Sequence, residues 1–377
     1  MRVGIDARLL HYQRAGISRY VMGLLTGFAS SPPGFELLVL MHRGSQAELP
    51  AMPGLHTGRL WTPSHHRLEQ FMLPLELSGW GIDLLHSPDF IPPFYRRCRS
   101  VVTIHDLAFL RYPHLLTDDS RRYYGQTPRA VRSADAVIAV SLTTKQDLVE
   151  GLGTPEDRVF VIPEAASPVF RALDDTQAVE TTRAKFGLES GYFLFVGTIE
   201  PRKNLSTLVR SYAHFRRRWL SDAGRVEPPP KLAIVGRIGW LYDEVFDLVQ
   251  RLELRASAVF LGEVSEADLV LLYNGALALT YVSLYEGFGL PALEAMACGT
   301  PVICSNVSAL PEVVGEAAIL VDPMDVEAQS EAMWQLVVNG TERERCRVRG
   351  LERARQFSWQ RTAAETARVY ESVMAKG

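Results

Sequence analysis

Short aliphatic and β-branched runs alternate with helical patterns along almost the whole chain, and this alternation limits the fold more than any other feature. It predicts parallel sheets built from strand–helix–strand units. The expected strands form two series of six, the second starting near Gly191. The first series is Val3–Asp6, Glu36–Met41, Asp83–His86, Ser100–His105, Ala134–Val140 and Arg158–Ile162. The second is Tyr192–Val196, Lys231–Val235, Ala258–Leu261, Leu277–Tyr281, Pro301–Ser305 and Ala317–Val321.

A chain of 377 residues is long enough for two domains, one for each series. Pro163–Ala178 is rich in Pro, Ala and Asp without a clear period, which indicates a linker. We therefore expect an N-terminal domain over 1–170, a linker over 171–190 and a second domain over 191–357. In open α/β sheets ligands bind beyond the carboxyl ends of the strands. Two doubly wound, Rossmann-like domains would thus face each other across a central cleft.

The composition is that of a globular protein, with 47% apolar and 22% charged residues. A net charge of −3 gives no reason to expect a nucleic acid as partner. The chain begins directly with a strand-like segment, so no signal peptide is expected, and no apolar run approaches the roughly 20 residues of a membrane span. The four cysteines form no CxxC pair. A reducing cytoplasm is the expected location.

The segment from Glu286 to Glu294, Glu-Gly-Phe-Gly-Leu-Pro-Ala-Leu-Glu, places two carboxylates around a turn that opens a helix over Pro291–Cys298. Pro291 suits a first helical position and Gly299 a C-cap. A helix N-terminus behind a glycine loop favours a phosphate. The two acids would repel that phosphate and suit the hydroxyl groups of a ribose and a sugar. The segment therefore predicts a nucleotide-sugar site.

Two adjacent cations, Arg202 and Lys203, follow the strand Tyr192–Val196 and precede a helix. Such a pair at a strand end can neutralise a diphosphate. The alternative is a solvated helix start, but cations near a helix N-terminus oppose its dipole. The pair therefore favours a binding function.

Three further candidates follow other strands. Gly16 lies just before a helix, where glycine permits a close ligand approach, although plain turn chemistry explains it equally well. His105 closes a strand and suits a substrate hydroxyl or phosphate, with Asp106 either orienting it or capping the next turn. Gly262-Glu263-Val264 offers backbone groups for a base edge, but an ordinary loop explains it as well. The other histidines, His65 among them, have no comparable context.

Several other chemistries lack their motifs. The chain has no GxSxG elbow, no P-loop and no HExxH pair. It also has no DxD triplet to hold a metal–diphosphate complex. We therefore expect no metal and no bound cofactor, with cations and helix amides stabilising a departing diphosphate.

The motifs together resemble those of the retaining glycosyltransferases of family 4, which have the GT-B fold. Glu286 to Glu294 is similar to that family's acid–seven–acid motif, and the blocks that follow it also match. The remaining matches are Leu310-Pro-Glu-Val-Val-Gly-Glu, Val321-Asp-Pro, Gly197-Thr-Ile-Glu-Pro-Arg-Lys-Asn, Thr103-Ile-His-Asp-Leu, Gly4-Ile-Asp-Ala-Arg and Gly16-Ile-Ser-Arg-Tyr. The resemblance spans nearly the whole chain.

The resemblance assigns roles by position. It implies that Glu294 binds the donor ribose, Glu286 lies near the donor sugar, and Arg202 with Lys203 holds the diphosphate. It also implies that Gly16 meets the phosphate and that His105 contacts the transferred sugar. The last helix, over 358–377, would pack back onto the N-terminal domain. The expected catalytic residues are His105, Arg202, Lys203 and Glu286. The expected donor-binding residues are Gly16, Gly197, Arg202, Lys203, Val264, Glu286, Gly287, Phe288, Gly289, Leu290 and Glu294.

The implied activity is metal-independent transfer of a sugar, with retention, from a nucleotide-diphosphate donor to a glycan or lipid-linked acceptor. The Gly-Thr-Ile-Glu-Pro-Arg-Lys-Asn block is similar to mannosyltransferases of the family, which favours GDP-mannose. The chain departs from the family at Thr198 and at Ala15, where many members have Arg and Gly. Two alternatives stay open. One is a nucleotide-sugar epimerase or a phosphorylase of the same fold, and the other is a non-catalytic nucleotide-sugar-binding protein, which is favoured if those departures disable catalysis.

Basic and aromatic residues gather in Phe94–Arg99 and Arg121–Tyr124. They suit a membrane surface or a glycan acceptor, although a solvated face is the favoured interpretation. A peripheral position at the inner face of a membrane therefore stays open beside the expected cytoplasmic location.

Overall fold

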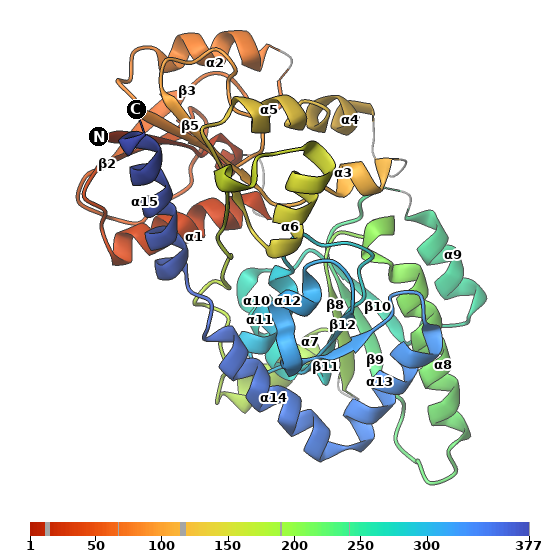
Figure 1. Ribbon diagram of the computed structural model, residues 1–377. Helices are drawn as coiled ribbons and strands as arrows, with labels where there is room; N and C mark the ends of the chain where they lie inside the picture. The colour runs from red at the N-terminus through yellow and green to blue at the C-terminus, as the bar shows by residue number, and fades with distance from the viewer. Residues whose placement is uncertain (12–15, 67, 114–117, 189–190, 241, 377) are drawn as a thin grey trace. The chain divides into compact units, whose positions relative to one another are not determined.

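The computed structural model describes residues 1–11, 16–66, 68–113, 118–188, 191–240 and 242–376, with the backbone alone for 118–120. Ala15 lies outside the described residues. The chain forms two compact units, each with its own parallel sheet (Figure 1). Unit 1 contains Met1–Ala165 together with Phe357–Gly377, and unit 2 contains Ala166–Gln356. The two parallel sheets confirm the doubly wound α/β class.

The sheet of unit 1 has seven strands in the order β3-β2-β1-β4-β5-β6-β7. The chain moves outward from β1 to β2 and β3, then returns to the other side of β1 with β4. Carboxyl ends of β1 and β4 therefore lie side by side at the point where the strand order reverses. The strands are β1 (Arg2–Asp6), β2 (Glu36–His42), β3 (Leu55–Leu60), β4 (Leu84–Ser87), β5 (Arg99–Ile104), β6 (Ala136–Ala139) and β7 (Val159–Val161).

Helices cover the unit 1 sheet and come from both ends of the chain. They are α1 (Ile17–Ser30), α2 (Glu69–Leu77), α3 (Ala108–Arg111), α4 (Asp118–Tyr124), α5 (Thr127–Ser133), α6 (Leu142–Gln146) and α15 (Trp359–Ala375). Short 3₁₀ turns at Arg8–His11 and Glu156–Arg158 and a π turn at Asp147–Gly151 complete the unit. The Ser141 hydroxyl accepts the Thr144 N–H and caps the start of α6.

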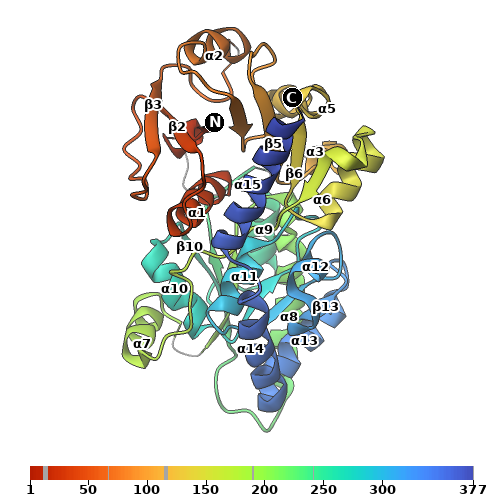
Figure 2. The same cartoon turned by 60° about the vertical axis from the view of Figure 1, so that its left-hand side comes forward.

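The C-terminal helix α15 packs lengthwise on α1, as both views show (Figures 1 and 2). Gly23 and Gly27 of α1 make this contact close. An added Cβ at Gly23 would lie 2.1 Å from the Trp359 ring, and one at Gly27 would lie 2.1 Å from the Trp359 carbonyl oxygen. Larger residues at these two positions would push the helices apart, so α15 is built into the core of unit 1.

Unit 2 has six strands in the order β10-β9-β8-β11-β12-β13. Its order reverses between β8 and β11, as it does between β1 and β4 in unit 1. The strands are β8 (Tyr192–Val196), β9 (Lys231–Val235), β10 (Ala258–Gly262), β11 (Ala278–Tyr281), β12 (Val302–Ser305) and β13 (Ile319–Val321). The helices are α7 (Thr176–Lys185), α8 (Leu205–Ser221), α9 (Asp243–Arg251), α10 (Glu266–Gly275), α11 (Leu290–Ala297), α12 (Leu310–Val314), α13 (Val326–Val338) and α14 (Gly340–Ala354), with 3₁₀ turns at Pro201–Lys203 and Gly315–Ala317.

Most strands lie within one or two residues of their expected bounds, but the sequence did not predict β3 or several of the helices, α2 and α7 among them. The strand β3 is an edge strand whose residues His56, Thr57 and Arg59 face solvent, so it lacks an apolar run. The helix α2 has apolar residues on two faces, which hides its period. The helix α7 falls inside the segment 171–190 that was expected to be a linker, and it packs as part of unit 2.

Candidate functional site

In unit 2 a cluster of charged side chains lies where the strand order reverses. Arg202 and Lys203 follow β8, and Glu286 follows β11, its neighbour in the sheet. The Lys203 ammonium donates to Glu286 Oε1 at 2.6 Å and to the Tyr281 hydroxyl at 2.9 Å. Arg202 donates to Glu286 Oε2 at 3.3 Å. This is the position at which an open α/β sheet binds its ligand.

The carboxylate of Glu286 is the centre of this cluster and is almost fully buried. Burial alone would raise its pKa, but Lys203 and Arg202 outweigh burial and lower it to about 2. The carboxylate is therefore ionised at neutral pH. It keeps the two cations ordered and offsets part of their charge in the absence of a ligand.

A second carboxylate, Glu200, accepts from Arg202 at 2.9 Å, and Arg202 also donates to the Tyr285 carbonyl oxygen at 3.0 Å. The arginine thus spans the loops that follow β8 and β11. Asn204, which directly follows the two cations, ties the loop after β8 to the loops after β11 and β13. Its backbone is left-handed with φ 57°, and its side-chain amide donates to the carbonyl oxygens of Val282 at 3.0 Å and Pro323 at 2.6 Å. Asn204 therefore positions the cations.

Two glycines allow the strand ends to come close together. An added Cβ at Gly236, which follows β9 with φ 143°, would lie 2.0 Å from the Gly197 carbonyl oxygen. The amide of Gly197 in turn donates to the Val235 carbonyl oxygen at 2.9 Å. A side chain at Gly236 would separate β8 from β9 just below the cations. Gly197 thus lies in the floor of the cluster.

The expected helix N-terminus is present, because α11 begins at Leu290. Gly289 caps it with φ 115°, and its carbonyl oxygen accepts the N–H groups of Ala292 at 3.0 Å and Leu293 at 3.3 Å. An added Cβ at Gly289 would lie 2.6 Å from the Leu310 side chain. Both the positive φ and the lack of space therefore require glycine at this position. The preceding Gly287 and Phe288 complete the loop, with Phe288 buried. Backbone amides at this turn offer positive charge beside Lys203 and Arg202.

The other acid of the motif, Glu294, lies on α11 and is 1% exposed. Its Oε2 accepts the hydroxyl of Tyr273, from α10, at 3.0 Å. Val264, half-buried, lies between β10 and the start of α10. These residues belong to unit 2, as do Gly197, Arg202, Lys203 and Glu286–Leu290.

The remaining two expected residues, Gly16 and His105, belong to unit 1. Gly16 precedes α1 with φ 51°, and an added Cβ there would meet no described atom within 4 Å. His105 follows β5 and is held by two acceptors, the Glu164 carboxylate at 2.7 Å and the Pro88 carbonyl oxygen at 2.9 Å. Both ring nitrogens must then carry a proton. Burial works against that charge, but Glu164 outweighs it and raises the pKa of His105.

Unit 1 has a second polar cluster that the sequence did not predict. Arg8 is 2% exposed and donates to Asp6, at the end of β1, at 2.7 Å. It also pairs with Glu69 of α2 and donates to the Thr62 carbonyl oxygen at 3.0 Å. Burial raises the pKa of Glu69, and Arg8 opposes that rise. A buried arginine thus joins the carboxyl ends of β1 and β3 to α2.

Beside this group, His65 pairs with Asp89, which follows β4. The His65 ring is tilted by 31° to the Tyr123 ring, with the ring centroids 3.9 Å apart, and the Tyr123 hydroxyl donates to the Asp89 carboxylate at 3.2 Å. The imidazole is partly buried, which lowers its pKa, but Asp89 outweighs burial and raises it. Asp89 Oδ1 is buried and accepts no hydrogen bond from the described residues. The backbone of His65 has a φ of 63°. A positive φ is uncommon for a residue other than glycine and occurs often at functional sites.

No short motif could have identified this cluster, because its partners come from separate elements. Arg8 and Glu69 lie 61 residues apart, and His65 and Asp89 lie 24 apart. The one available signal was topological. Asp6 is the last residue of β1 and Asp89 follows β4, and these are the two strands between which the order reverses.

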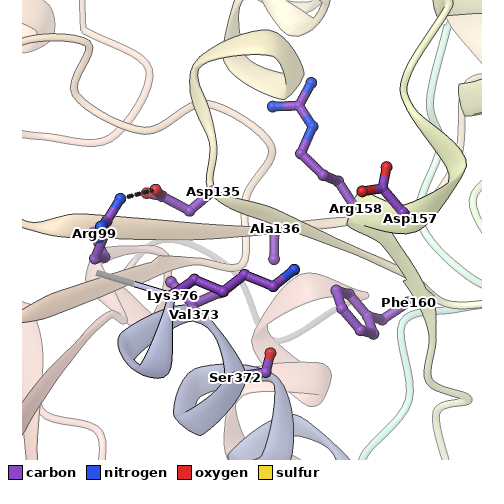
Figure 3. Close-up of a pocket in the computed structure, with 9 residues that line it drawn as sticks. All are labelled: Arg99, Asp135, Ala136, Asp157, Arg158, Phe160, Ser372, Val373 and Lys376. Carbon is purple, nitrogen blue, oxygen red and sulfur yellow. Dashed lines mark hydrogen bonds and ion pairs between the residues drawn. The ribbon is translucent and has the colours of Figure 1, made fainter.

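A pocket elsewhere in unit 1 does not coincide with either cluster. It is lined by residues at the amino ends of β5, β6 and β7 and at the end of α15, among them Arg99, Arg158 and Lys376 (Figure 3). Arg99 is already paired with Asp135 at 2.8 Å. Amino ends of parallel strands are not where α/β sheets hold their substrates. The pocket therefore does not compete with the two clusters as the candidate site.

Among the described residues, no group of three or more histidine, cysteine, aspartate or glutamate side chains has a metal-binding arrangement. Within the same residues no helix combines the length and the apolar character needed to cross a membrane.

Comparison with known proteins identifies the family. Residues 179–353 match the model for glycosyl transferases group 1, and residues 14–168 match the model for glycosyltransferase family 4. An O-antigen chain mannosyltransferase B from Escherichia coli is 31% identical over 98% of this chain and 100% of its own length.

Solved structures agree in fold. Sucrose-phosphate synthase from Thermosynechococcus elongatus superposes with a TM-score of 0.78, 21% identity and full coverage of both chains. The Anabaena protein HepE, solved with UDP and glucose, gives a TM-score of 0.76 with 17% identity over 99% of this chain and 100% of its own. With its two parallel sheets and its matched sequence blocks, this chain belongs to glycosyltransferase family 4 and has the GT-B fold.

Proposed function

We propose that this glycosyltransferase moves mannose from GDP-mannose to a glycan or lipid-linked acceptor, with retention and without a metal. The donor preference is supported by the mannosyltransferase from Escherichia coli that shares 31% of its residues. The observation that carries the proposal is the arrangement of Lys203, Arg202 and Glu286 beside the N-terminus of α11. Cations and helix amides converge there at the carboxyl end of a parallel sheet.

Lys203 is the residue best placed to hold the donor diphosphate. An ammonium has three N–H donors, and the described partners of Lys203 are Glu286 and Tyr281. The third N–H remains for a phosphate oxygen. Arg202 adds a second cation, and the N-terminus of α11 adds the positive end of a helix dipole. These groups would stabilise the negative charge that grows on the diphosphate as the sugar departs.

The two acids would bind hydroxyl groups. Glu294 is the proposed partner of the donor ribose, with Tyr273 fixing its carboxylate. Glu286 would face the sugar while it orients Lys203. Gly197, Val264 and the loop Gly287–Leu290 would supply backbone contacts around the nucleotide.

Retention follows if the acceptor hydroxyl attacks the anomeric carbon on the same face from which the diphosphate leaves. The bond from that carbon to the phosphate oxygen breaks, the bond to the acceptor oxygen forms, and the acceptor proton passes to the departing phosphate. Of the expected residues, His105 would add a fixed positive charge near the transferred sugar. A direct hydrogen bond to the sugar would require His105 to exchange one of its two present partners.

The proposed acceptor position is the cluster of unit 1 that contains His65, Asp89 and Tyr123. Its carboxylates and imidazole suit hydroxyl groups, and the tyrosine ring offers a face for a sugar ring. The unpartnered Oδ1 of Asp89 is a ready acceptor for a hydroxyl. The surplus of acids there would repel a diphosphate, so the donor diphosphate would not bind at the acceptor position.

A thermal-shift screen of GDP-, UDP- and ADP-sugars tests the donor. A ligand at 100 times its Kd stabilises the folded state by about 2.7 kcal/mol, a readily visible shift. GDP-mannose should give the largest shift, and a larger shift with a UDP- or ADP-sugar would overturn the proposed donor.

Two measurements test the mechanism. NMR of the product should show the same anomeric configuration as the donor. The rate of sugar transfer should be unchanged when EDTA is added. Inversion would contradict the mechanism, and loss of activity in EDTA would contradict metal independence.

A further inference from the structure

The helix α2 of unit 1 turns an apolar face toward solvent. Leu68, Phe71, Met72 and Leu75 follow the i, i+3, i+4, i+7 spacing of one helix face. They are 51%, 68%, 42% and 75% exposed, respectively. Such a stripe normally faces the core of a soluble protein. Here the stripe is exposed, and α2 itself lies at the periphery of unit 1 (Figures 1 and 2).

The opposite face of α2 is fixed inward by polar contacts. Glu69 pairs with the buried Arg8. Glu76 accepts the backbone N–H groups of Trp61 at 2.7 Å and Thr62 at 3.0 Å. Leu73, between the two acids, is 1% exposed and packs in a core cluster under the helix. Rotating α2 to bury its outer stripe would break these contacts, so the exposed orientation is built into the fold.

Exposed aromatic residues extend the stripe. Trp61 is 64% exposed and is tied to α2 through its N–H bond to Glu76. Tyr95 is 68% exposed and follows Phe94, whose N–H donates to Gln70 of α2 at 2.9 Å. We call this surface the α2 face. It consists of Trp61, Leu68, Phe71, Met72, Leu75 and Tyr95.

The charges around the α2 face are arranged by sign. The carboxylates on and beside α2 point inward, where each has a partner. Arg8 holds Glu69, His65 holds Asp89, and two backbone amides hold Glu76. Cations point outward. The Arg43 guanidinium lies 3.6 Å above the Trp61 ring, and Arg97, two residues after Tyr95, is exposed. The apolar stripe is therefore bordered by aromatic rings and arginines.

We propose that the α2 face binds the surface of a lipid bilayer that contains anionic headgroups. Its aliphatic side chains would enter the boundary between headgroups and acyl chains. Trp61 and Tyr95 would lie at headgroup level, and Arg43 and Arg97 would contact phosphates. The aromatic and arginine border favours this occupant over a second copy of the chain, whose matching face would bring the arginines together. The inference goes beyond the proposed reaction and does not depend on it.

Vesicle flotation without substrate tests the proposal. The full chain should float with vesicles that contain phosphatidylglycerol, and binding to phosphatidylcholine alone should be at least about tenfold weaker because arginine contacts to anionic lipid are lost. The double variant Phe71→Ser, Leu75→Ser should lose most of the binding. Both residues are exposed, so the fold should be kept, with circular dichroism as the check. The matched control is Leu220→Ser, Val226→Ser in unit 2, at 58% and 95% exposure, which should bind as the wild type does.

Two further measurements sharpen the test. Lipids with brominated acyl chains should quench tryptophan fluorescence, and Trp61→Phe should remove most of that quenching. Arg43→Gln with Arg97→Gln should weaken binding to anionic vesicles several-fold. Equal flotation of the Phe71, Leu75 variant and the wild type would overturn the proposal. The proposal would also be overturned if the wild type is a dimer that does not bind vesicles and the Phe71, Leu75 variant is a monomer. The α2 face would then be occupied by a second copy of the chain.

Discussion

The two units place charged clusters at the same point of their topology, but the unit 2 cluster has as many cations as acids and the unit 1 cluster has more acids than cations. In unit 2, between β8 and β11, Lys203 and Arg202 meet Glu286 and Glu200 beside a helix N-terminus. In unit 1, between β1 and β4, Arg8 and His65 meet the larger set of Asp6, Glu69 and Asp89. We expect the cluster of unit 2, beside a helix N-terminus, to bind a phosphate and the cluster of unit 1, with its excess of acids, to repel one. In the proposed function, the first cluster would therefore hold the anionic donor and the second a hydroxyl-rich acceptor.

Removing the cation of unit 2 should give the largest effect. Lys203→Ala should lower kcat roughly 10²- to 10³-fold, equivalent to about 2.7–4 kcal/mol, if Lys203 contributes like an oxyanion-hole donor. Lys185→Ala, which breaks an exposed pair with Asp268 in the same unit, is the control and should leave kcat unchanged. Near-wild-type turnover of Lys203→Ala, in a folded protein, would remove the proposed difference between the clusters.

Neutralising the carboxylate of unit 2 should cost stability in a pH-dependent way. The pKa of Glu286 is about 2 in the folded protein and 4.5 unperturbed. A shift of that size corresponds to roughly 3 kcal/mol at most. Because the pKa is lowered by folding, this stabilisation is fully present above about pH 4.5 and is lost as the pH falls through 2.

Thermal unfolding of the wild type and Glu286→Gln at several pH values measures that contribution. The variant should be clearly less stable at pH 7, and the gap should narrow steadily below pH 4.5. A gap that is absent at pH 7, or that widens on acidification, would show that Glu286 is not the counter-ion of the two cations.

The unit 1 cluster should affect the acceptor and leave the donor untouched. His65→Asn should reduce transfer to the acceptor about tenfold, near the ~1.4 kcal/mol of one hydrogen bond to a charged group. Asparagine tolerates a positive φ, so the backbone should be kept. Hydrolysis of GDP-mannose without acceptor should not change. The exposed neighbour His66→Asn is the control. A parallel fall in transfer and hydrolysis would place His65 outside the acceptor site.

The difference between the clusters also explains what the sequence could predict. In unit 2 the site is local: Arg202 and Lys203 adjoin one strand, and Glu286 to Glu294 is a single segment. The sequence therefore predicted both the strands of unit 2 and its cation–acid pattern. It did not predict that Glu286 holds Lys203, because a pairing of residues 83 positions apart depends on β8 and β11 being neighbours.

In unit 1 the partners are scattered over β1, the loop after β3, α2 and the loop after β4. Two of these elements, β3 and α2, were not predicted, since an edge strand needs no apolar run and α2 is apolar on two faces. His65 had no context until the fold brought Asp89 and Tyr123 to it. His105 was predicted, but its two acceptors, Glu164 and the Pro88 carbonyl oxygen, were not.

Calorimetric titration of GDP-mannose into the wild type, Lys203→Ala and His65→Asn tests the division between the clusters most directly. Lys203→Ala should weaken binding by at least about tenfold, or ~1.4 kcal/mol, while His65→Asn should bind as the wild type does. Unchanged affinity in Lys203→Ala, or an equal loss in His65→Asn, would contradict it.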